Sequence, residues 1–356
     1  MKKSTLALAV AAALVGFGSA AYADTTLYGS ARVSVDYDDF DSWYESVNGQ
    51  LVRTTPGYEG WDVYNNTSRL GVRGEEDLGG GLAAIYQYEF GVDVTDGSNF
   101  TSNRPKWVGL KGSSWGSVTA GTQWTPYYNV IGIGDIFNSA KVFDRDIYLG
   151  DAYGLRMDNS LIYSTPNWSG FSAQAMLVMN GQGASTNKLV DNWSDGIDMW
   201  NIAFSYKNGP FFAGATYMAL NDSNDLLSGT PYDEPEQWGL AFGYNAGPFG
   251  ITLAYENGDL NSLYLDKTEN IYLTGQYTFG NNVLRASYGY LSPDVGSIET
   301  APNSFLTQSD IQNWALGYQY NLSKRTRLWV EYVGQSVDSD LVGNRQTVSI
   351  GTRVDF

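Results

Sequence analysis

The charged residues of this sequence can shape an electric field, but they cannot support the common catalytic chemistries. The 356 residues include no histidine and no cysteine. A histidine-activated nucleophile, a histidine acid or base and an ordinary zinc site are therefore excluded, and an enzyme would be left with carboxylate, lysine or tyrosine chemistry. By the period of two of a β-strand, Arg69 and Arg73 share one face, as do Arg104 and Lys106. We predict no enzyme, no metal site and no cofactor.

Amphipathic segments are the elements that would position these side chains. From Thr25 onward, runs of about ten residues alternate apolar and polar side chains, and short and long connections join them in turn. The clearest apolar faces are Trp200, Ile202, Phe204 and Tyr206; Trp238, Leu240, Phe242 and Tyr244; and Trp314, Leu316, Tyr318 and Tyr320. This alternation of connection lengths is typical of a barrel that crosses the bacterial outer membrane.

Counting these runs predicts sixteen strands. Their expected starts are Thr25, Ser68, Leu82, Asn103, Gly116, Met157, Phe171, Ile197, Phe211, Glu236, Gly250, Asn270, Val283, Asp310, Thr326 and Asn344. An even number places both termini on the periplasmic side, and a barrel of this size leaves an aqueous lumen. The predicted fold class is all-β, a 16-stranded antiparallel transmembrane β-barrel.

The two ends of the chain indicate export. Residues 1–23 combine Lys2 and Lys3 with an apolar stretch and small residues before Asp24, which is typical of a cleaved signal peptide. We therefore expect the barrel to comprise residues 24–356. The last strand alternates apolar and polar residues and ends on Phe356. With 38 acidic against 21 basic residues, nucleic acid is not an expected partner.

The composition favours a membrane barrel over a soluble β-protein. The chain contains 26 tyrosines, 11 tryptophans and 41 glycines, and only 17% of its residues are charged. A soluble sandwich or propeller would have to bury its apolar faces in a packed core. Here those faces are rich in aromatic residues and the opposite faces are too polar for a core, so aromatic belts at two membrane interfaces are the better interpretation.

Short motifs give the strands a more specific character. They are Leu27-Tyr28-Gly29, the run from Ser68 to Glu75, the run from Asn103 to Gly112, the run from Trp115 to Gln123, the run from Asp158 to Ser164, and the terminal Phe356. In order and spacing these motifs resemble those of the Gram-negative general-diffusion porin family. The resemblance implies a homotrimer in the outer membrane, in contact with lipid and lipopolysaccharide. It also implies that Phe356 is a signal for the outer-membrane assembly machinery.

The same resemblance implies a pore constriction. The third outer loop, about 124–155, would fold into the lumen and narrow it, opposite a wall of basic side chains. By motif position the basic wall comprises Arg69, Arg104 and Arg156, with Arg32, Arg73 and Lys106 as neighbours, and the acidic residues of the loop are Asp135, Asp144 and Asp146. Acids facing arginines across a narrow gap orient dipolar solutes. We expect Arg285, Arg327 and Arg353 to be general charges of the lumen.

The third loop departs from the pattern of the best-known enteric members. Their Pro-Glu-Phe-Gly-Gly signature is missing, and the run from Ile136 to Ser139 stands near its place. Asp135 keeps the acidic character, but Ser139 replaces the carboxylate expected four residues later. Asp144 and Asp146 could supply that charge, or Arg145 between them could neutralise it.

We therefore expect an outer-membrane channel for the passive diffusion of small hydrophilic solutes and ions. A substrate-specific channel for sugars or anions and a barrel with a mainly adhesive or receptor role are the alternatives. A sugar channel would need a row of inward aromatics, whereas the inward faces here are mainly small, polar or basic. A barrel hydrolase, which is a further alternative, would need a histidine, and the chain has none. The excess of acidic residues slightly favours the permeation of cations over anions. The acidic loops are expected to be solvated loop tips, and weak binding sites for divalent ions are the alternative.

Overall fold

The computed structural model describes residues 24–47, 50–97, 100–101, 104–143, 155–179, 196–220, 236–259, 267–293, 310–338 and 343–356. The expected signal peptide, 1–23, lies outside these ranges. Two of the expected pore residues, Asp144 and Asp146, also lie outside them.

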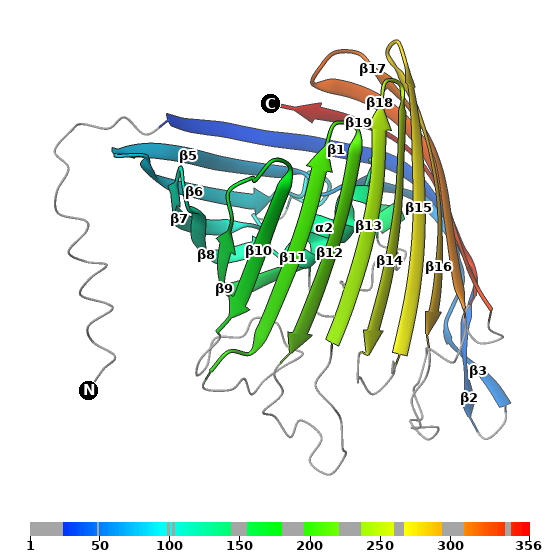
Figure 1. Ribbon diagram of the computed structural model, residues 1–356. Coiled ribbons are helices and arrows are strands. Elements are labelled where there is room, and N and C mark those ends of the chain that lie inside the picture. Colours follow the sequence, from blue (N-terminus) through cyan, green and yellow to red (C-terminus); the bar gives the residue numbers. More distant parts are fainter. Residues whose placement is uncertain are drawn as a thin grey trace.

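The described residues form one large antiparallel sheet and a separate hairpin (Figure 1). The strands of the sheet are β1 (Asp24–Phe40), β4 (Tyr58–Asn65), β5 (Arg69–Gly79), β6 (Leu82–Gly91), β7 (Lys106–Gly112), β8 (Gly116–Trp124), β9 (Arg156–Ser164), β10 (Phe171–Val178), β11 (Met199–Asn208), β12 (Phe211–Leu220), β13 (Glu236–Ala246), β14 (Phe249–Asp259), β15 (Lys267–Phe279), β16 (Asn282–Pro293), β17 (Ile311–Asn321), β18 (Thr326–Val337) and β19 (Arg345–Asp355). The hairpin pairs β2 (Trp43–Val47) with β3 (Gln50–Thr55).

The first and last strands close the sheet into a barrel. β1 pairs with β19 from Ser30 opposite Asp355 to Phe40 opposite Arg345. On its other edge β1 pairs with β5 and then with β4, so these two strands are one barrel strand interrupted between Asn65 and Arg69. The 17-stranded sheet of the described residues is therefore a barrel of sixteen strands, which confirms the predicted fold class.

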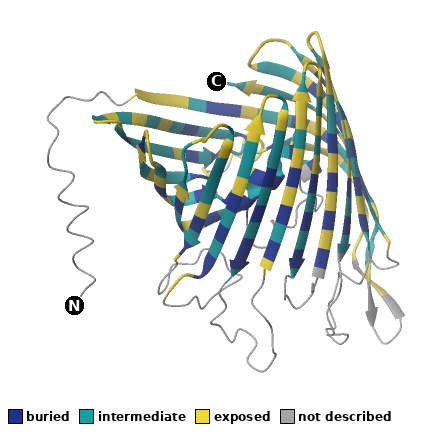
Figure 2. Cartoon of the chain, in the orientation of Figure 1, coloured by how far each residue is buried: buried dark blue, intermediate teal, exposed yellow. Residues whose placement is uncertain are grey.

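Alternation along each strand separates an outer apolar face from an inner face. Phe204 and Phe242 are both 55% exposed, and Leu316 is 60% exposed, whereas their neighbours Ala203 and Ala241 are buried inside the barrel. The alternating stripes of burial are visible along β11 to β14 (Figure 2). An outer surface made of large apolar side chains suits a hydrocarbon environment. The closed barrel suits it as well, because it leaves no strand edge unpaired in lipid.

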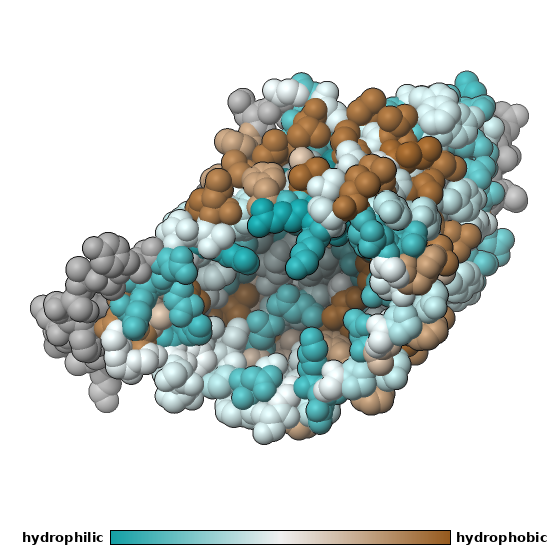
Figure 3. All heavy atoms as spheres, turned by 90° about the horizontal axis from the view of Figure 1, so that it is seen from above, coloured by the Kyte–Doolittle hydropathy of each residue, from teal (hydrophilic) through white to brown (hydrophobic). Residues whose placement is uncertain are grey.

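Short turns join the strands at one end of the barrel. In the turns that contain Gly209, Gly247 and Gly280, φ of the glycine is +55° or +56°. A two-residue hairpin turn needs this positive φ, which glycine adopts without the steric cost of a Cβ atom. Viewed from this end, the molecule is hollowed at its centre, and hydrophilic residues gather around the hollow (Figure 3).

The connection between β8 and β9 contains the helices of the described chain. They are α2 (Pro126–Ile131), the 3-10 turn η1 (Gly132–Gly134) and α3 (Ala140–Phe143). Thr125 caps α2, since its side-chain oxygen accepts a hydrogen bond from the backbone N–H of Tyr128, and Pro126 occupies the first turn. No helix in the described part of the chain is long and apolar enough to cross a membrane.

Candidate functional site

The third loop lies against the inner wall of the barrel. α2 contacts β10 to β13 and η1 contacts β14 and β15, and α2 lies behind β11 to β13 in Figure 1. Two inner glycines make this close approach possible: a Cβ atom on Gly214 would lie 2.8 Å from Val130, and one on Gly239 would lie 2.7 Å from Ile131. The described part of the loop therefore occupies space inside the barrel.

Polar groups on the wall fix the first half of the loop. Tyr127 is fully buried; its backbone N–H donates to the Asn201 side chain at 2.7 Å, and its hydroxyl donates to the Glu256 carboxylate at 2.9 Å. Glu256 also accepts a hydrogen bond from the Asn270 side chain at 2.7 Å. These contacts satisfy buried polar groups on β11, β14 and β15, so they hold α2 in one position.

A buried carboxylate on β18 holds the second half of the loop. Glu331 accepts hydrogen bonds from the backbone N–H groups of Asn138 and Ser139, the shortest at 2.7 Å. Further along, Ala140 donates its N–H to the Asn66 side chain at 2.8 Å, and Lys141 forms an ion pair with Asp38 at 3.1 Å. From Tyr127 to Lys141 the loop therefore follows the inner wall from β11 to β1.

Three arginines form a row on neighbouring strands. The register places Arg32 of β1 opposite Arg353 of β19, and Arg353 opposite Arg327 of β18. Asp355 binds both Arg353, at 2.8 Å, and Arg327. The Arg32 Nε donates to the Ser30 hydroxyl at 2.7 Å. One carboxylate thus serves two of the three cations, and the row keeps a positive charge.

Two more arginines extend the basic wall along the barrel. Arg69 lies opposite Ser30 in the register, beside the row of three arginines. Arg104, just before β7, is buried and pairs with Glu89 at 2.7 Å. The Tyr28 hydroxyl donates to the same carboxylate at 2.9 Å. The guanidinium of Arg104 is therefore fixed in place by an acid of the neighbouring strand β6.

Asp135 is the acidic residue of the loop that faces this wall. Its carboxylate is exposed to the lumen and accepts a hydrogen bond from the Tyr128 hydroxyl at 3.1 Å. Desolvation raises the pKa of Asp135, while the Tyr128 hydrogen bond and the charges of Arg32, Arg69 and Arg353 act in the opposite direction. The loop acid and the basic wall are thus within electrostatic reach of each other.

Arg156 belongs to the loop side of the site. Its guanidinium lies 4.4 Å from the ring centre of Trp124, and that ring stacks on Tyr128 at 4.3 Å. Because Tyr128 also holds Asp135, the cation, the two rings and the carboxylate form one continuous unit at the start of the loop. The stacking restricts the guanidinium to a defined orientation.

With one exception, the predicted pore residues that the structure describes come together, while Asp144 and Asp146 lie outside the described ranges. Arg32, Arg69, Arg104, Arg156 and Asp135 gather at the site as described above. Arg73 also lies on the inner face, where its guanidinium is 5.2 Å from the ring centre of Tyr28.

The prediction that Lys106 shares the lumen face with Arg104 is wrong. Lys106 pairs with Tyr88 and Thr122, on the same face of β7 as Val108, which is 56% exposed on the outside. Its ammonium group lies 5.1 Å from the ring centre of Phe90. The period of two does not extend from Arg104 to Lys106, because β7 begins only at Lys106 and the preceding residues are not in a strand.

Sequence reasoning underrated several residues of the site. Arg353 and Arg327 were expected only as general charges of the lumen, although the register makes them part of the arginine row. The acids Glu89, Glu331 and Asp355 were not predicted. Each of these acids alternates with apolar neighbours, a signal that could have indicated an inward side chain. Only the pairing of distant strands shows which cation or loop residue each acid binds.

The site shows no metal-binding geometry. Among the residues that the structure describes, no group of three or more acidic, histidine or cysteine side chains is arranged to hold a metal ion. The described side chains of the site present fixed charges to the lumen.

A closed sixteen-stranded barrel with an apolar exterior, a polar lumen and an inward loop defines a diffusion channel of the outer membrane. A family model for Gram-negative porins matches residues 7–340, and the chain belongs to that family. It is an outer-membrane porin, through which small hydrophilic solutes diffuse passively.

Individual relatives support this assignment over nearly the whole chain. An outer membrane porin protein of Bordetella pertussis is 29% identical over 361 residues, a match that covers 92% of this chain and 93% of that protein. The outer membrane porin protein 32 of Delftia acidovorans is 30% identical, covering 92% and 88%. An anion-selective porin from Comamonas acidovorans has a similar fold, with a TM-score of 0.67 and 22% identity over 94% of this chain and 100% of that one.

Proposed function

We propose that the third loop and the arginine row form the constriction of the pore, and that this constriction favours small anions over cations. Three contacts support the position of the loop: Tyr127 with Glu256, Asn138 with Glu331, and Lys141 with Asp38. Together they hold the loop along the inner wall, from which Asp135 faces Arg32 and Arg69. Permeant ions would pass between the loop and these arginines.

The balance of local charge carries the selectivity proposal. Among the described charged residues of the lumen and the loop contacts named above, eight cations stand against six carboxylates: Arg32, Arg69, Arg73, Arg104, Lys141, Arg156, Arg327 and Arg353 against Asp38, Glu89, Asp135, Glu256, Glu331 and Asp355. The net local charge is therefore positive, although the whole chain has a formal charge of −17. Exposed charges more than about 8 Å from the ion path are largely screened at physiological ionic strength, so the nearby arginines outweigh the distant acidic loops. This reverses the slight preference for cations expected from composition.

The experiment is the reversal potential of the porin in planar bilayers under a potassium chloride gradient. The wild type should select chloride over potassium. A unit charge roughly 8 Å from the ion in water changes the energy of an anion and that of a cation by about 0.5 kcal/mol in opposite directions. Arg32→Gln and Arg353→Gln should therefore each lower the anion-to-cation permeability ratio about fivefold.

Arg325→Gln is the matched control for this experiment, because Arg325 is exposed on a short turn of the barrel. A shift equal to that of the control for both lumen variants would remove the arginine row from the ion path. A cation-selective wild type would contradict the proposed selectivity.

We further propose a homotrimer, supported by the outer surface. At the short-turn end, aromatic pairs occur on β10 to β15: Phe171 with Tyr206, Phe211 with Tyr244, and Phe249 with Tyr277. Such rings favour the lipid interface, whereas the outer faces of β7 and β8 carry small or aliphatic residues such as Val108 and Val118. The smoother surface is suited to packing against other copies of the chain. Closure of single channels in three successive steps would support the trimer.

The ends of the chain fit the same assignment. We propose that residues 1–23 are removed as a signal peptide and that Phe356 is recognised by the assembly machinery of the outer membrane. Phe356 exchanges two backbone hydrogen bonds with Gly29, at 2.9 and 3.1 Å. The last residue therefore completes the pairing of β19 with β1, which explains why assembly would depend on it.

A further inference from the structure

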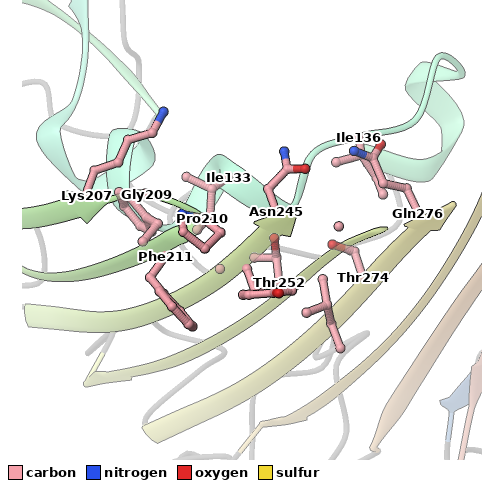
Figure 4. Close-up of a pocket in the computed structure, with 15 residues that line it drawn as sticks. Ile133, Ile136, Lys207, Gly209, Pro210, Phe211, Asn245, Thr252, Thr274 and Gln276 are labelled. Carbon is pink, nitrogen blue, oxygen red and sulfur yellow. The ribbon is translucent and has the colours of Figure 1, made fainter. Parts of the chain in front are cut away.

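A cavity of about 410 Å³ separates the third loop from the inner wall at the short-turn end of the barrel (Figure 4). Ile133 and Ile136 of the loop cover it, and the inner residues of β12 to β15 form its floor. Its volume lies within the range of roughly 300–1,000 Å³ that is usual for small-molecule sites. The arginine row and Asp135 are not among its lining residues, so this cavity is distinct from the constriction.

One part of the cavity is apolar. Ile133, Ile136 and Phe212 are half-buried there and pack against the hydrophobic cluster beneath the loop. Gly243 lies between them: a Cβ atom added to this residue would lie 3.5 Å from Phe212 and 3.6 Å from Ile133. The absence of a side chain at Gly243 therefore leaves the space between loop and wall open. An alkyl chain placed there would be removed from water on several sides.

Polar side chains line another part of the cavity, and one of them carries a positive charge. Lys207 lies at one end of the cavity, Gln276 at the other, and Asn245 between them (Figure 4). In the described part of the barrel, Lys207 is the only charged residue that lines this cavity. Its side chain is exposed, and none of the ion pairs between described residues involves it, so an incoming anion would not need to displace a partner carboxylate.

From this arrangement we propose that the cavity is a weak binding site for short-chain aliphatic carboxylates. The carboxylate pairs with Lys207 and accepts a hydrogen bond from Asn245, and the alkyl chain lies against Ile133, Ile136 and Phe212. A charge-assisted contact combined with apolar burial selects this class over small inorganic anions, which gain nothing from the apolar part. The site rests on the channel function, since solutes reach it only through the lumen. Weak affinity suits a permeation path, because the solute must also leave.

The test is the transient block of single-channel current by acetate, butyrate and hexanoate at constant ionic strength. Affinity should rise about threefold for each added methylene, because each one buries apolar surface. Lys207→Gln should weaken hexanoate binding about threefold, because an exposed charge-assisted contact is worth up to about 1 kcal/mol. Gly243→Ala adds a Cβ atom at ordinary contact distance from Phe212 and Ile133, so it narrows the apolar part of the cavity and should weaken the dependence on chain length.

Lys324→Gln is the matched control, because Lys324 is an exposed lysine on another short turn of the barrel. Unchanged open-channel conductance shows that each variant barrel is assembled. The proposal is overturned if affinity does not depend on chain length, or if Lys207→Gln behaves like Lys324→Gln. It is also overturned if Arg69→Gln abolishes hexanoate binding while Lys207→Gln does not, because binding then takes place at the constriction. The reversal potentials that test the constriction do not depend on any of these results.

Discussion

Glu331 should control whether the third loop stays against the wall. Its two carboxylate oxygens accept the backbone N–H groups of Asn138 and Ser139 and the side-chain amide of Asn138, at 2.7 to 3.1 Å. Arg285 lies beside the same carboxylate, at 3.9 Å. The side chain of Glu331 is almost fully buried, so water cannot replace it as the acceptor of these hydrogen bonds. Replacing Glu331 by glutamine changes the shape very little but removes one of the two acceptor oxygens.

The size of the effect follows from the hydrogen bonds that are lost. The amide nitrogen of Glu331→Gln cannot accept the N–H of Ser139 if the remaining oxygen serves Asn138. One hydrogen bond to a charged group is worth about 1.5–3 kcal/mol, and the buried N–H is left unpaired. Removing a buried charge offsets part of this loss. We therefore expect the docked loop to be destabilised by about 2 kcal/mol, which corresponds to about a 30-fold rise in the undocked population.

A single introduced cysteine can measure this population. The chain has no cysteine, so Ser139→Cys would be the only thiol. Ser139 is only 4% exposed, and its thiol should react slowly with a maleimide while the loop is docked. In the Glu331→Gln background the reaction rate should rise about 30-fold. The current should also become noisier, because the loop then leaves its position in the lumen.

Glu75→Gln is the control for this measurement. Glu75 pairs with Lys111 at 3.0 Å, but both side chains are about half exposed, so the loss of this pair should change little. A reaction rate for Glu331→Gln within threefold of the Glu75→Gln rate would refute the reasoning. It would mean that the apolar contacts of α2 hold the whole loop without the carboxylate.

Two further predictions concern Asp135 and Gly29. As the pH falls through the raised pKa of Asp135, its carboxylate becomes neutral and the anion-to-cation permeability ratio should rise about fivefold. This rise should occur above the pH range in which an ordinary aspartate titrates, and a ratio that follows pH equally in Asp135→Asn would contradict the prediction. A Cβ atom on Gly29 would collide with the ring of Phe356 and lie 2.9 Å from the backbone oxygen of Arg69. Gly29→Val should therefore slow the folding of the barrel in detergent, which is measured by heat-modifiable mobility on gels. Gly275→Val is the control, since its nearest neighbour would be 3.9 Å away, and equal folding rates for both variants would show that Phe356 does not need this space.

The strand pattern could be predicted because it is local. Alternation with a period of two depends only on which side chains prefer lipid and which prefer water, and the run from Trp238 to Tyr244 shows it without any reference to its partners. Fifteen of the sixteen starts therefore lie within three residues of the strands observed. The exception is the second barrel strand, which was expected near Ser68 but begins with β4 at Tyr58, because the interruption between Asn65 and Arg69 separates β4 from β5.

The site could be predicted only in part. Arg32 and Arg69 face the lumen because the pattern of their own strands requires it. Lys106 was misplaced because the chain before β7 is irregular, so the period of two could not be counted back to Arg104. A local rule fails where the local structure changes.

The sequence by itself determined the sixteen amphipathic strands, the polar lumen and the sign of each wall residue, because each of these depends on neighbours along the chain. Only the tertiary structure decided that Arg32 lies beside Arg353, that Glu331 holds Asn138, and that Asp135 faces the arginines. These contacts join residues from distant parts of the chain, and they depend on strand register and on the docking of a loop against glycines on the inner wall. Many registers and loop positions are compatible with the same local pattern, and packing selects one of them.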